Sequence, residues 1–550
     1  MSVSSRLLLT TTTASLRGGN APTTRLHSRK IFSKLKSLWR QLLLKNFVNH
    51  SVQEALPSNY LKALMDSSVA QQECKKSKMQ PYLDTCYNPN NTNQMCDVSF
   101  NNAPANLMYC QSGAYTDTTH SINTCGINRK HRNYLDKQTY KAIRKWKQIG
   151  GGRSKSMEDT FLLKLLSFNI LAQNLLETYH FLYKRHNKQA LDWNIRKSLI
   201  IEEILDAEAN IICLQEVQQD HLMDIVDPFR RIGYDYIYKK RTNEKNDGLL
   251  LLYRSDEFLL LDHAKVELYQ SGIELLSRDN VGIIAKLALR SNPDTQIVVA
   301  TTHLLYNPKR NDVRLAQIQL LLAEIERIAF VENTITGPKY LPILLSGDFN
   351  LEPYTGVYKF LTEGSFTYNG KGRSLESPEV RSLSNFLIPP RLCVTDNCQH
   401  FNILTKRLRK EGTGKIMLEN SEFPVKKGEN TFDTCNLDTL QHSNDSGRTQ
   451  IIEIVQGYSV QFSSGTLTHP FKLRSVYNHT AYGEKEATTH QDEWVTVDYI
   501  FYSNIKPVEK YALLTVSQCY KLRAIPNFVV GSDHLCIGAT FQLPKKKSSL

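Results

Sequence analysis

Short apolar runs recur along the chain from about residue 161 onward. Examples are FLLKLLSFNIL at 161–171, YDYIYKK at 234–240, DGLLLLYR at 247–254, VGIIAKLAL at 281–289 and QIVVATTHLL at 296–305. Apolar runs of this length, bounded by polar and turn residues, are typical of buried β-strands. The C-terminal part of the chain is therefore expected to be rich in strands.

Two longer stretches carry apolar residues near helical spacing. The stretch 191–217 predicts a helix followed by a strand, and residues 313–330 predict a long amphipathic helix. Strands in hairpin-like succession, interspersed with a few long helices, favour two facing sheets with helices outside. We expect an α/β domain over residues 157–550 that carries a polar insertion at about 370–465.

The N-terminal part of the chain differs in composition from the part that follows. Residues 1–50 contain no acid, are rich in Arg, Ser and Thr, and include an amphipathic basic segment at 30–47. These features are typical of a mitochondrial transit peptide, with a basic tail or surface helix as the alternative, so we expect a cytoplasmic or mitochondrial protein. Residues 51–156 are poor in periodic apolar positions, which predicts a largely disordered extension with one short helix near 136–147.

Composition narrows the class of protein. Of the net charge of +14, nine positive charges precede Glu54, and 14 − 9 leaves only +5 for the rest of the chain. No apolar run is long enough to predict a membrane span. The eleven cysteines are an odd number without a C-x-x-C pair, and Cys393 and Cys398 lack partners at zinc-ligand spacing, which favours reduced thiols.

Six of the apolar runs have polar groups at or near their ends. These groups are Asn169, Glu216, His303, Asp348 with Asn350, Asp498, and the pair Asp533 and His534 before the last run. A lone polar residue at a strand end is usually a surface or capping residue. Six such positions, with acids, amides and imidazoles among them, instead indicate a site at which the strand ends converge.

These residue types suit the cleavage of phosphate esters. A divalent ion neutralises the charge of a phosphate diester and orients the attacking and leaving oxygens. We expect Mg²⁺, with Mn²⁺ as an alternative, because Mg²⁺ prefers oxygen ligands and is commonly held by one or two carboxylates, whereas zinc would ask for more His or Cys. Asp348 would then take a proton from water, and a second acid would keep His534 protonated as a hydrogen-bond donor to phosphoryl oxygens.

The ordered series SFNIL, LQEV, TTHLLYNPKRNDVRLAQ, SGDFN, TVDYIFYS and SDHL resembles the endonuclease/exonuclease/phosphatase superfamily over about residues 161–545. Within it, the chain resembles the branch of the deadenylases, Nocturnin and the Angel proteins. The segments THLLYNPKRNDVRLAQ, LLAEI and ELLSRDNVG are most similar to the Angel proteins. The resemblance implies a deoxyribonuclease-I-like, four-layer α/β/β/α sandwich with a Mg²⁺-dependent phosphoesterase site where the sheets meet.

The resemblance also implies roles for individual residues. Those that match positions at or beside the metal are Glu216, Asn169 and Asp533. Asp348 and Asn350 match the pair that activates water and positions phosphate. His534 matches the catalytic histidine, and Asp498 matches the acid that orients it. His303 matches a histidine that contacts phosphate.

The substrate implied by the resemblance is an RNA 3′ end. The leading expectation is hydrolysis of 2′,3′-cyclic phosphates, and the alternative is a 3′–5′ exonuclease that shortens poly(A). An inositol-phosphate or sphingomyelin hydrolase and a non-catalytic binding protein are weaker alternatives. Lys309, Arg310 and Arg314 are either surface charges or contacts to the RNA backbone. Residues 55–160 lack the Tyr-x-x-x-x-Leu docking motif of some Angel relatives, so this motif does not support a translation-factor partner, and the sequence identifies no protein partner.

Overall fold

The computed structural model describes residues 134–150, 160–378, 382–411, 416–418, 450–454 and 458–546. The targeting-like segment 1–50 and most of the low-complexity segment 51–156 lie outside these residues, and so do the expectations that we attached to them. In the part of the chain that is described, no helix is long and apolar enough to cross a membrane.

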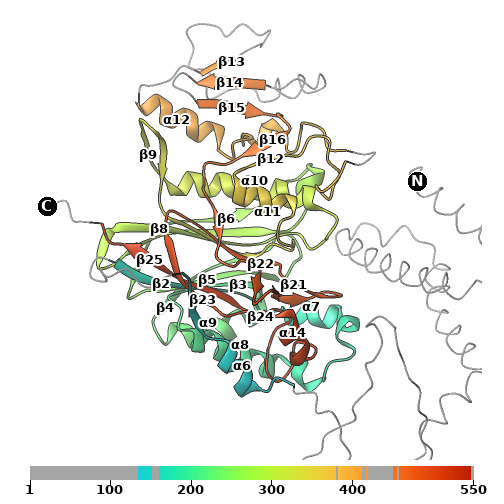
Figure 1. The fold of residues 1–550 in the computed structure, drawn as a ribbon. Coiled ribbons are helices and arrows are strands. Elements are labelled where there is room, and N and C mark those ends of the chain that lie inside the picture. The colour runs from blue at the N-terminus through green and yellow to red at the C-terminus, as the bar shows by residue number, and fades with distance from the viewer. Residues whose placement is uncertain are drawn as a thin grey trace, which may run out of the picture. The chain divides into compact units, whose positions relative to one another are not determined.

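Two mixed β-sheets form the centre of the fold (Figure 1). The first has the strand order β1 (Trp146–Gln148), β23 (Lys506–Tyr511), β25 (Ile537–Pro544), β2 (Thr160–Asn169), β3 (Ile211–Gln218), β5 (Asp247–Arg254) and β4 (Tyr234–Lys240). The second has the order β17 (Arg474–Ser475), β22 (Asp498–Ser503), β11 (Ile343–Asp348), β8 (Asn292–His303), β7 (Val281–Leu289) and β6 (Phe258–Glu267).

Helices cover the outer face of each sheet. Helices α8 (Trp193–Ala207) and α9 (Leu222–Arg230) pack on the first sheet, and α10 (Asn311–Ala329) and α11 (Gly356–Glu363) pack on the second (Figure 1). The four layers of the α/β/β/α sandwich expected from the sequence are thereby confirmed.

Side chains that alternate between the two faces of each strand pack the layers against one another. In β11 and β8, Leu344 and Val299 belong to the apolar core between the two sheets. Their neighbours Leu345 and Val298 belong instead to the core beneath α10 and α11. Successive side chains of a strand point to opposite faces, so a strand that is apolar at every position is buried on both. This is why the sequence shows continuous apolar runs rather than alternating ones.

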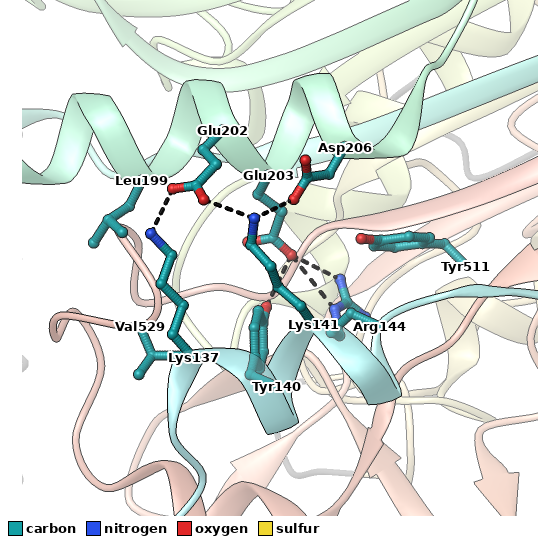
Figure 2. A pocket seen from close by; sticks show the side chains of 10 residues that line it. All are labelled: Lys137, Tyr140, Lys141, Arg144, Leu199, Glu202, Glu203, Asp206, Tyr511 and Val529. Atoms are coloured by element: carbon teal, nitrogen blue, oxygen red, sulfur yellow. Dashed lines mark hydrogen bonds and ion pairs between the residues drawn. The ribbon is translucent and has the colours of Figure 1, made fainter.

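Residues 134–150 belong to the folded domain, although the sequence suggested that they form part of the extension. Helix α6 (Lys137–Ile143) corresponds to the short helix expected near 136–147, and β1 pairs with β23 at the edge of the first sheet. Figure 2 shows Lys137 and Lys141 of α6 facing Glu202 and Asp206 of α8, with distances of 2.6 Å in each ion pair.

A buried ion pair lies behind these surface pairs. The guanidinium of Arg144, which is 3% exposed, lies 3.3 Å from the carboxylate of Glu203 and also donates to the carbonyl oxygens of Ala512 and Cys536. The hydroxyl of Tyr140 donates to the same carboxylate at 2.8 Å (Figure 2). The domain therefore begins before the expected boundary at residue 157, because α6 packs against α8 and β1 is an edge strand of the first sheet.

The expected polar insertion contains regular elements where it is described. Strands β12 (Ser365–Thr367) and β16 (Thr466–Thr468) pair at its base, and β13 (Ile416–Leu418), β14 (Gln450–Ile454) and β15 (Tyr458–Phe462) form a small sheet. Helix α12 (Phe401–Glu411) is attached to α10 by Arg407, which lies 2.7 Å from the buried carboxylate of Glu326. The polar composition thus reflects a surface subdomain as well as loops.

Candidate active site

The register of the second sheet brings three candidate residues side by side. Asp348 at the end of β11 is paired with His303 on the parallel strand β8 and with Asp498 on the antiparallel strand β22. Gly347 makes this close pairing possible, because its φ is +142° and a Cβ there would lie 2.0 Å from the carbonyl oxygen of Thr302. The apolar run therefore ends at a glycine that lets β11 approach β8 just before the carboxylate of Asp348.

Asp348 is the centre of the polar cluster. Its carboxylate is buried, and its Oδ2 accepts a hydrogen bond of 3.0 Å from Nδ2 of Asn169, which ends β2 of the other sheet. The Nε2 atoms of His303 and His534 lie 3.5 and 3.7 Å from the same oxygen. Burial raises the pKa of Asp348, although the two imidazoles oppose this shift. The two sheets therefore meet at this carboxylate.

His534 is oriented by Asp498. The Nδ1 atom of His534 lies 2.8 Å from Oδ2 of Asp498, and both side chains are buried. Burial alone would lower the pKa of His534, but Asp498, with Asp348 and Asp533, raises it well above the ordinary value. This shift favours the protonated imidazole, whose Nδ1 donates to Asp498 and whose Nε2 lies on the side of Asp348.

The backbone around this pair is fixed by Thr488 and Thr489. The hydroxyl oxygen of Thr488 accepts from the backbone N–H of Val497 at 3.1 Å, and its carbonyl oxygen accepts from the N–H of Leu535 at 2.7 Å. The hydroxyl of Thr489 donates to the carbonyl oxygen of Asp533 at 2.7 Å. One dipeptide therefore joins the segments that carry Asp498 and His534.

Glu216 is placed by an irregularity in β3. The register between β3 and β5 shifts between Leu214 and Val217, and Glu216 has a φ of +58°, a left-handed conformation that is rare for this residue type. Its carboxylate accepts hydrogen bonds from Nδ2 of Asn169 at 3.0 Å and from the N–H of Ala172 at 3.1 Å. Backbone strain of this kind persists where surrounding contacts over-determine the position, often at functional sites.

A divalent cation fits this group of residues. Burial, with the charges of Asp533 and Asp247, raises the pKa of Glu216 to about 7, so the ionised carboxylate would be stabilised by a nearby cation. The carboxylates of Glu216, Asp348 and Asp533 supply oxygen ligands, which suit hard cations, and Asn169 holds the first two through Nδ2.

Asp348, Asp498 and His534 also bring ligand atoms within 4.8 Å of one another. In this trio Nδ1 of His534 is already paired with Asp498, and a protonated imidazole donates hydrogen bonds rather than binding a metal. The oxygen-rich group around Glu216 is therefore the better cation site.

Asp533 and Asn350 are held by contacts beyond the strand ends. Oδ2 of Asp533 accepts a hydrogen bond of 2.8 Å from the hydroxyl of Tyr183, at the end of the 3₁₀ helix η3 (His180–Tyr183). Asn350 has a φ of +53°, donates through Nδ2 to the carbonyl oxygen of Leu304 at 3.0 Å, and donates through its backbone N–H to Oδ1 of Asp348 at 2.9 Å. The loops that follow β8 and β11 are thereby fixed to each other.

The three basic residues proposed for RNA contact lie in different environments. Lys309 is exposed, and Arg310 forms an ion pair of 2.9 Å with Asp312. Arg314 is 1% exposed, and its guanidinium donates to the carbonyl oxygens of Leu305 and Asn307 at 2.9 and 2.7 Å. These contacts give Arg314 a structural role in shaping the loop after His303.

The structure thus brings Asn169, Glu216, His303, Asp348, Asn350, Asp498, Asp533 and His534 to one edge where the two sheets meet. Sequence reasoning missed the residues that hold them, namely Tyr183, Arg196, Thr488 and Thr489. Arg196 is fully buried and donates to the carbonyl oxygens of Gly531 and Ile170 at 2.8 and 2.7 Å. No local signal marks these residues, because each acts through a partner distant in the chain.

Comparisons with known proteins agree with this geometry. The profile of the Endonuclease/Exonuclease/phosphatase family matches residues 166–534. The chain is 33% identical to human Protein angel homolog 2 over 423 residues, which cover 71% of each protein. It is 31% identical to Protein angel of Drosophila melanogaster over 413 residues, which cover 72% of this chain and 86% of that one.

A solved structure is similar over the same region. It is ANGEL2, described as a 2′,3′-cyclic phosphatase, in complex with adenosine-2′,3′-vanadate. The identity is 32% and the TM-score is 0.56, and the match covers 73% of this chain and 98% of that one.

Proposed function

Since the chain belongs to the endonuclease/exonuclease/phosphatase family and to its Angel branch, we propose that it hydrolyses 2′,3′-cyclic phosphates at RNA 3′ ends with the help of Mg²⁺. The observation that carries the proposal is the complete set of acid, amide and imidazole side chains around Asp348. A 2′,3′-cyclic phosphatase of 32% identity, whose chain is matched over 98% of its length, supports the choice of substrate.

The residues of the site divide the reaction between them. Asp348 accepts a proton from the attacking water, whose oxygen forms a bond to phosphorus while one of the two ester P–O bonds of the ring breaks. His534, held protonated by Asp498, donates a hydrogen bond to the phosphoryl oxygens as negative charge develops there. The ribose oxygen that leaves takes up a proton from solvent, Asp348 returns its proton to solvent, and the product is a phosphate monoester.

Glu216, Asn169 and Asp533 would hold the ion. A bound Mg²⁺ supplies charge that offsets the phosphate and polarises its P–O bonds. Glu216 is suited to this role because its pKa is raised by burial and by neighbouring carboxylates, an arrangement that a cation stabilises. Asn169 donates to both Glu216 and Asp348, so it keeps the metal-binding and catalytic carboxylates in a fixed relation.

The full-length protein tests the proposal with two labelled RNAs. One ends in a 2′,3′-cyclic phosphate, and the other carries a 3′ adenosine tail with a free hydroxyl. We expect Mg²⁺-dependent conversion of the first to a monophosphate end without shortening. Glu216→Gln and His534→Asn should each lower kcat/KM on the order of 100- to 10,000-fold. The control Asp262→Asn, an exposed position on edge strand β6, should leave the rate unchanged.

Two results would contradict the proposal. A ladder of shortened products from the adenosine-tailed RNA, with the cyclic end untouched, would make the protein a poly(A)-shortening exonuclease. Full turnover by both site variants would remove the assignment of the site itself.

A further inference from the structure

Three loops of the domain are joined beside His303, outside the group of catalytic residues. The loop 277–280 precedes β7, the loop 304–310 follows β8, and the loop 241–247 connects β4 with β5 of the other sheet. Each loop contributes at least one arginine, namely Arg278, Arg310 and Arg241. These arginines come from both sheets, at the same edge as the catalytic residues.

Buried amides fix the first two loops to each other. Nδ2 of Asn280 donates to the carbonyl oxygen of His303 at 2.8 Å, and Nε2 of Gln317 on α10 donates to Oδ1 of Asn280 at 2.8 Å. The other end of the same amide, Oε1 of Gln317, accepts from the N–H of Leu305 at 3.2 Å. Arg278 lies two residues from Asn280, within about 7 Å of chain, so it is held close to the strand end that carries His303.

The third loop is attached through Asp279. Its Oδ1 accepts hydrogen bonds from the hydroxyl of Thr242, at 2.7 Å, and from Nδ2 of Asn243. Two of the arginines have carboxylate partners, because Arg241 pairs with Asp247 and Arg310 pairs with Asp312.

Arg278 differs from the other two arginines. In the described part of the chain its only hydrogen bonds run from Nη1 to the backbone and side-chain oxygens of Ser277, at 2.7 and 2.8 Å, and no carboxylate lies at ion-pair distance. Burial and the charge of Arg310 lower the pKa of Arg278, although Glu274, Asp312 and Asp279 oppose the shift. A partly buried guanidinium that has no carboxylate partner is stabilised by an anion.

We propose that Arg278, together with Arg310, binds the phosphodiester that precedes the terminal nucleotide of the RNA. This inference rests on the proposed function, because it names the second phosphate of the same substrate. Guanidinium groups bind phosphate through two parallel N–H donors, and Arg278 keeps Nε and Nη2 available among the described residues. The site selects for a polynucleotide over a mononucleotide, since only a polynucleotide carries a phosphate at this position.

The test compares two substrates that share the reacting group. Adenosine 2′,3′-cyclic monophosphate has no further phosphate, whereas a pentanucleotide RNA with a 2′,3′-cyclic end has one at each linkage. For Arg278→Ala we expect KM for the pentanucleotide to rise about tenfold or more at unchanged kcat. The kinetics of the mononucleotide should stay as in the wild type, and Arg278→Lys should recover part of the affinity for the pentanucleotide.

A matched control removes the same charge elsewhere. Arg290 is exposed and follows the opposite end of β7, so Arg290→Ala should leave both substrates unaffected. The dependence of log KM on log salt for the pentanucleotide should become shallower by about 0.7 in Arg278→Ala alone. An equal loss on both substrates, or no loss on either, would overturn the inference.

Failure of the proposed function would be seen separately. If the wild type turned over neither substrate, the fluorescence anisotropy of a 5′-fluorescein pentanucleotide with a 3′ hydroxyl would still measure the affinity of the protein for RNA. Weaker binding in Arg278→Ala, but not in Arg290→Ala, would then support the phosphate site, and equal binding in all three proteins would refute it.

Discussion

At the scale of single residues, we expect the pairing of His534 with Asp498 to set the pH range of activity. In the proposed mechanism the protonated imidazole is the active form, so activity should be retained below the pKa of His534 and fall as the pH rises through it. Asp498 is the largest contribution that raises this pKa. We therefore expect Asp498→Asn to move the alkaline fall of the kcat profile to lower pH and to reduce the maximum by about 100-fold or more.

A control for this shift is Asp396→Asn, in the insertion. Asp396 is also buried, at 6% exposure, and accepts a hydrogen bond from the N–H of Ser464 at 2.7 Å. Its substitution should leave the pH profile in place. A profile of Asp498→Asn that superimposes on the wild type after scaling would show that Asp498 does not set the charge of His534.

Tyr183 provides a second test at this scale. Its hydroxyl donates to Asp533 at 2.8 Å, and residues that orient a metal-binding group typically change metal affinity by about 10- to 100-fold when they are substituted. We expect Tyr183→Phe to raise the Mg²⁺ concentration for half-maximal activity about tenfold, with kcat at saturating Mg²⁺ little changed.

Tyr234→Phe serves as the matched variant, because the hydroxyl of Tyr234 donates to the carbonyl oxygen of Ala209 rather than to a site residue. An unchanged Mg²⁺ requirement in Tyr183→Phe would mean that Asp533 needs no such support.

At the scale of elements, Arg144 links α6 and β1 to the domain through its buried ion pair with Glu203. Removing one partner of a buried ion pair typically costs about 3–5 kcal/mol, because the remaining charge stays buried. We expect Arg144→Met to lower the free energy of unfolding by about this amount, measured by urea denaturation. Lys137→Met should cost no more than about 1 kcal/mol, since the pair of Lys137 with Glu202 is exposed.

The double variant Arg144→Met/Glu203→Gln separates charge from packing. If the uncompensated carboxylate causes the loss, the double variant should be more stable than Arg144→Met alone. Additive losses would instead mean that the two residues stabilise the fold independently.

Strands and helices with long apolar runs could be predicted from the sequence, including the edge strand β4, whereas the charged edge strand β6 could not. The runs at 234–240, 247–254 and 281–289 coincide with β4, β5 and β7, and the helix expected at 313–330 is α10 at Asn311–Ala329. Strand β6 escaped notice because its central residues Asp262 and His263 are exposed. An edge strand of this kind carries charges that blunt its pairing, which removes the apolar run that identifies a strand.

More of the candidate site could be predicted from the sequence than of the contacts that hold it in place. Polar residues at strand ends, such as Glu216 and His303, stand out because the apolar runs beside them are unbroken. Arg144 had no such signal, since its partners Glu203 and Cys536 lie 59 and 392 residues away. Arg278 lies within the Angel-like motif ELLSRDNVG, but nothing in the motif predicts its surroundings, which depend on loops from both sheets.

At the scale of the whole molecule, all residues of the proposed site lie between Asn169 and His534. A fragment of residues 134–550 contains them together with α6 and β1. We expect this fragment to match the full chain in kcat/KM on an RNA with a cyclic phosphate end, measured under the same Mg²⁺ and salt conditions. A large loss in the fragment would place a substrate contact within residues 1–133.

The short strand β1 has a consequence for how the N-terminal boundary of such a fragment is chosen. It covers β23 through the pairs Trp146 with Tyr511 and Gln148 with Glu509. Proteolytic cleavage between residues 151 and 159 that released this strand would leave the amides and carbonyls of β23 open to another chain. Such cleaved molecules would associate through their exposed sheet edges. The protein would then lose solubility while the residues of the proposed site were still in place.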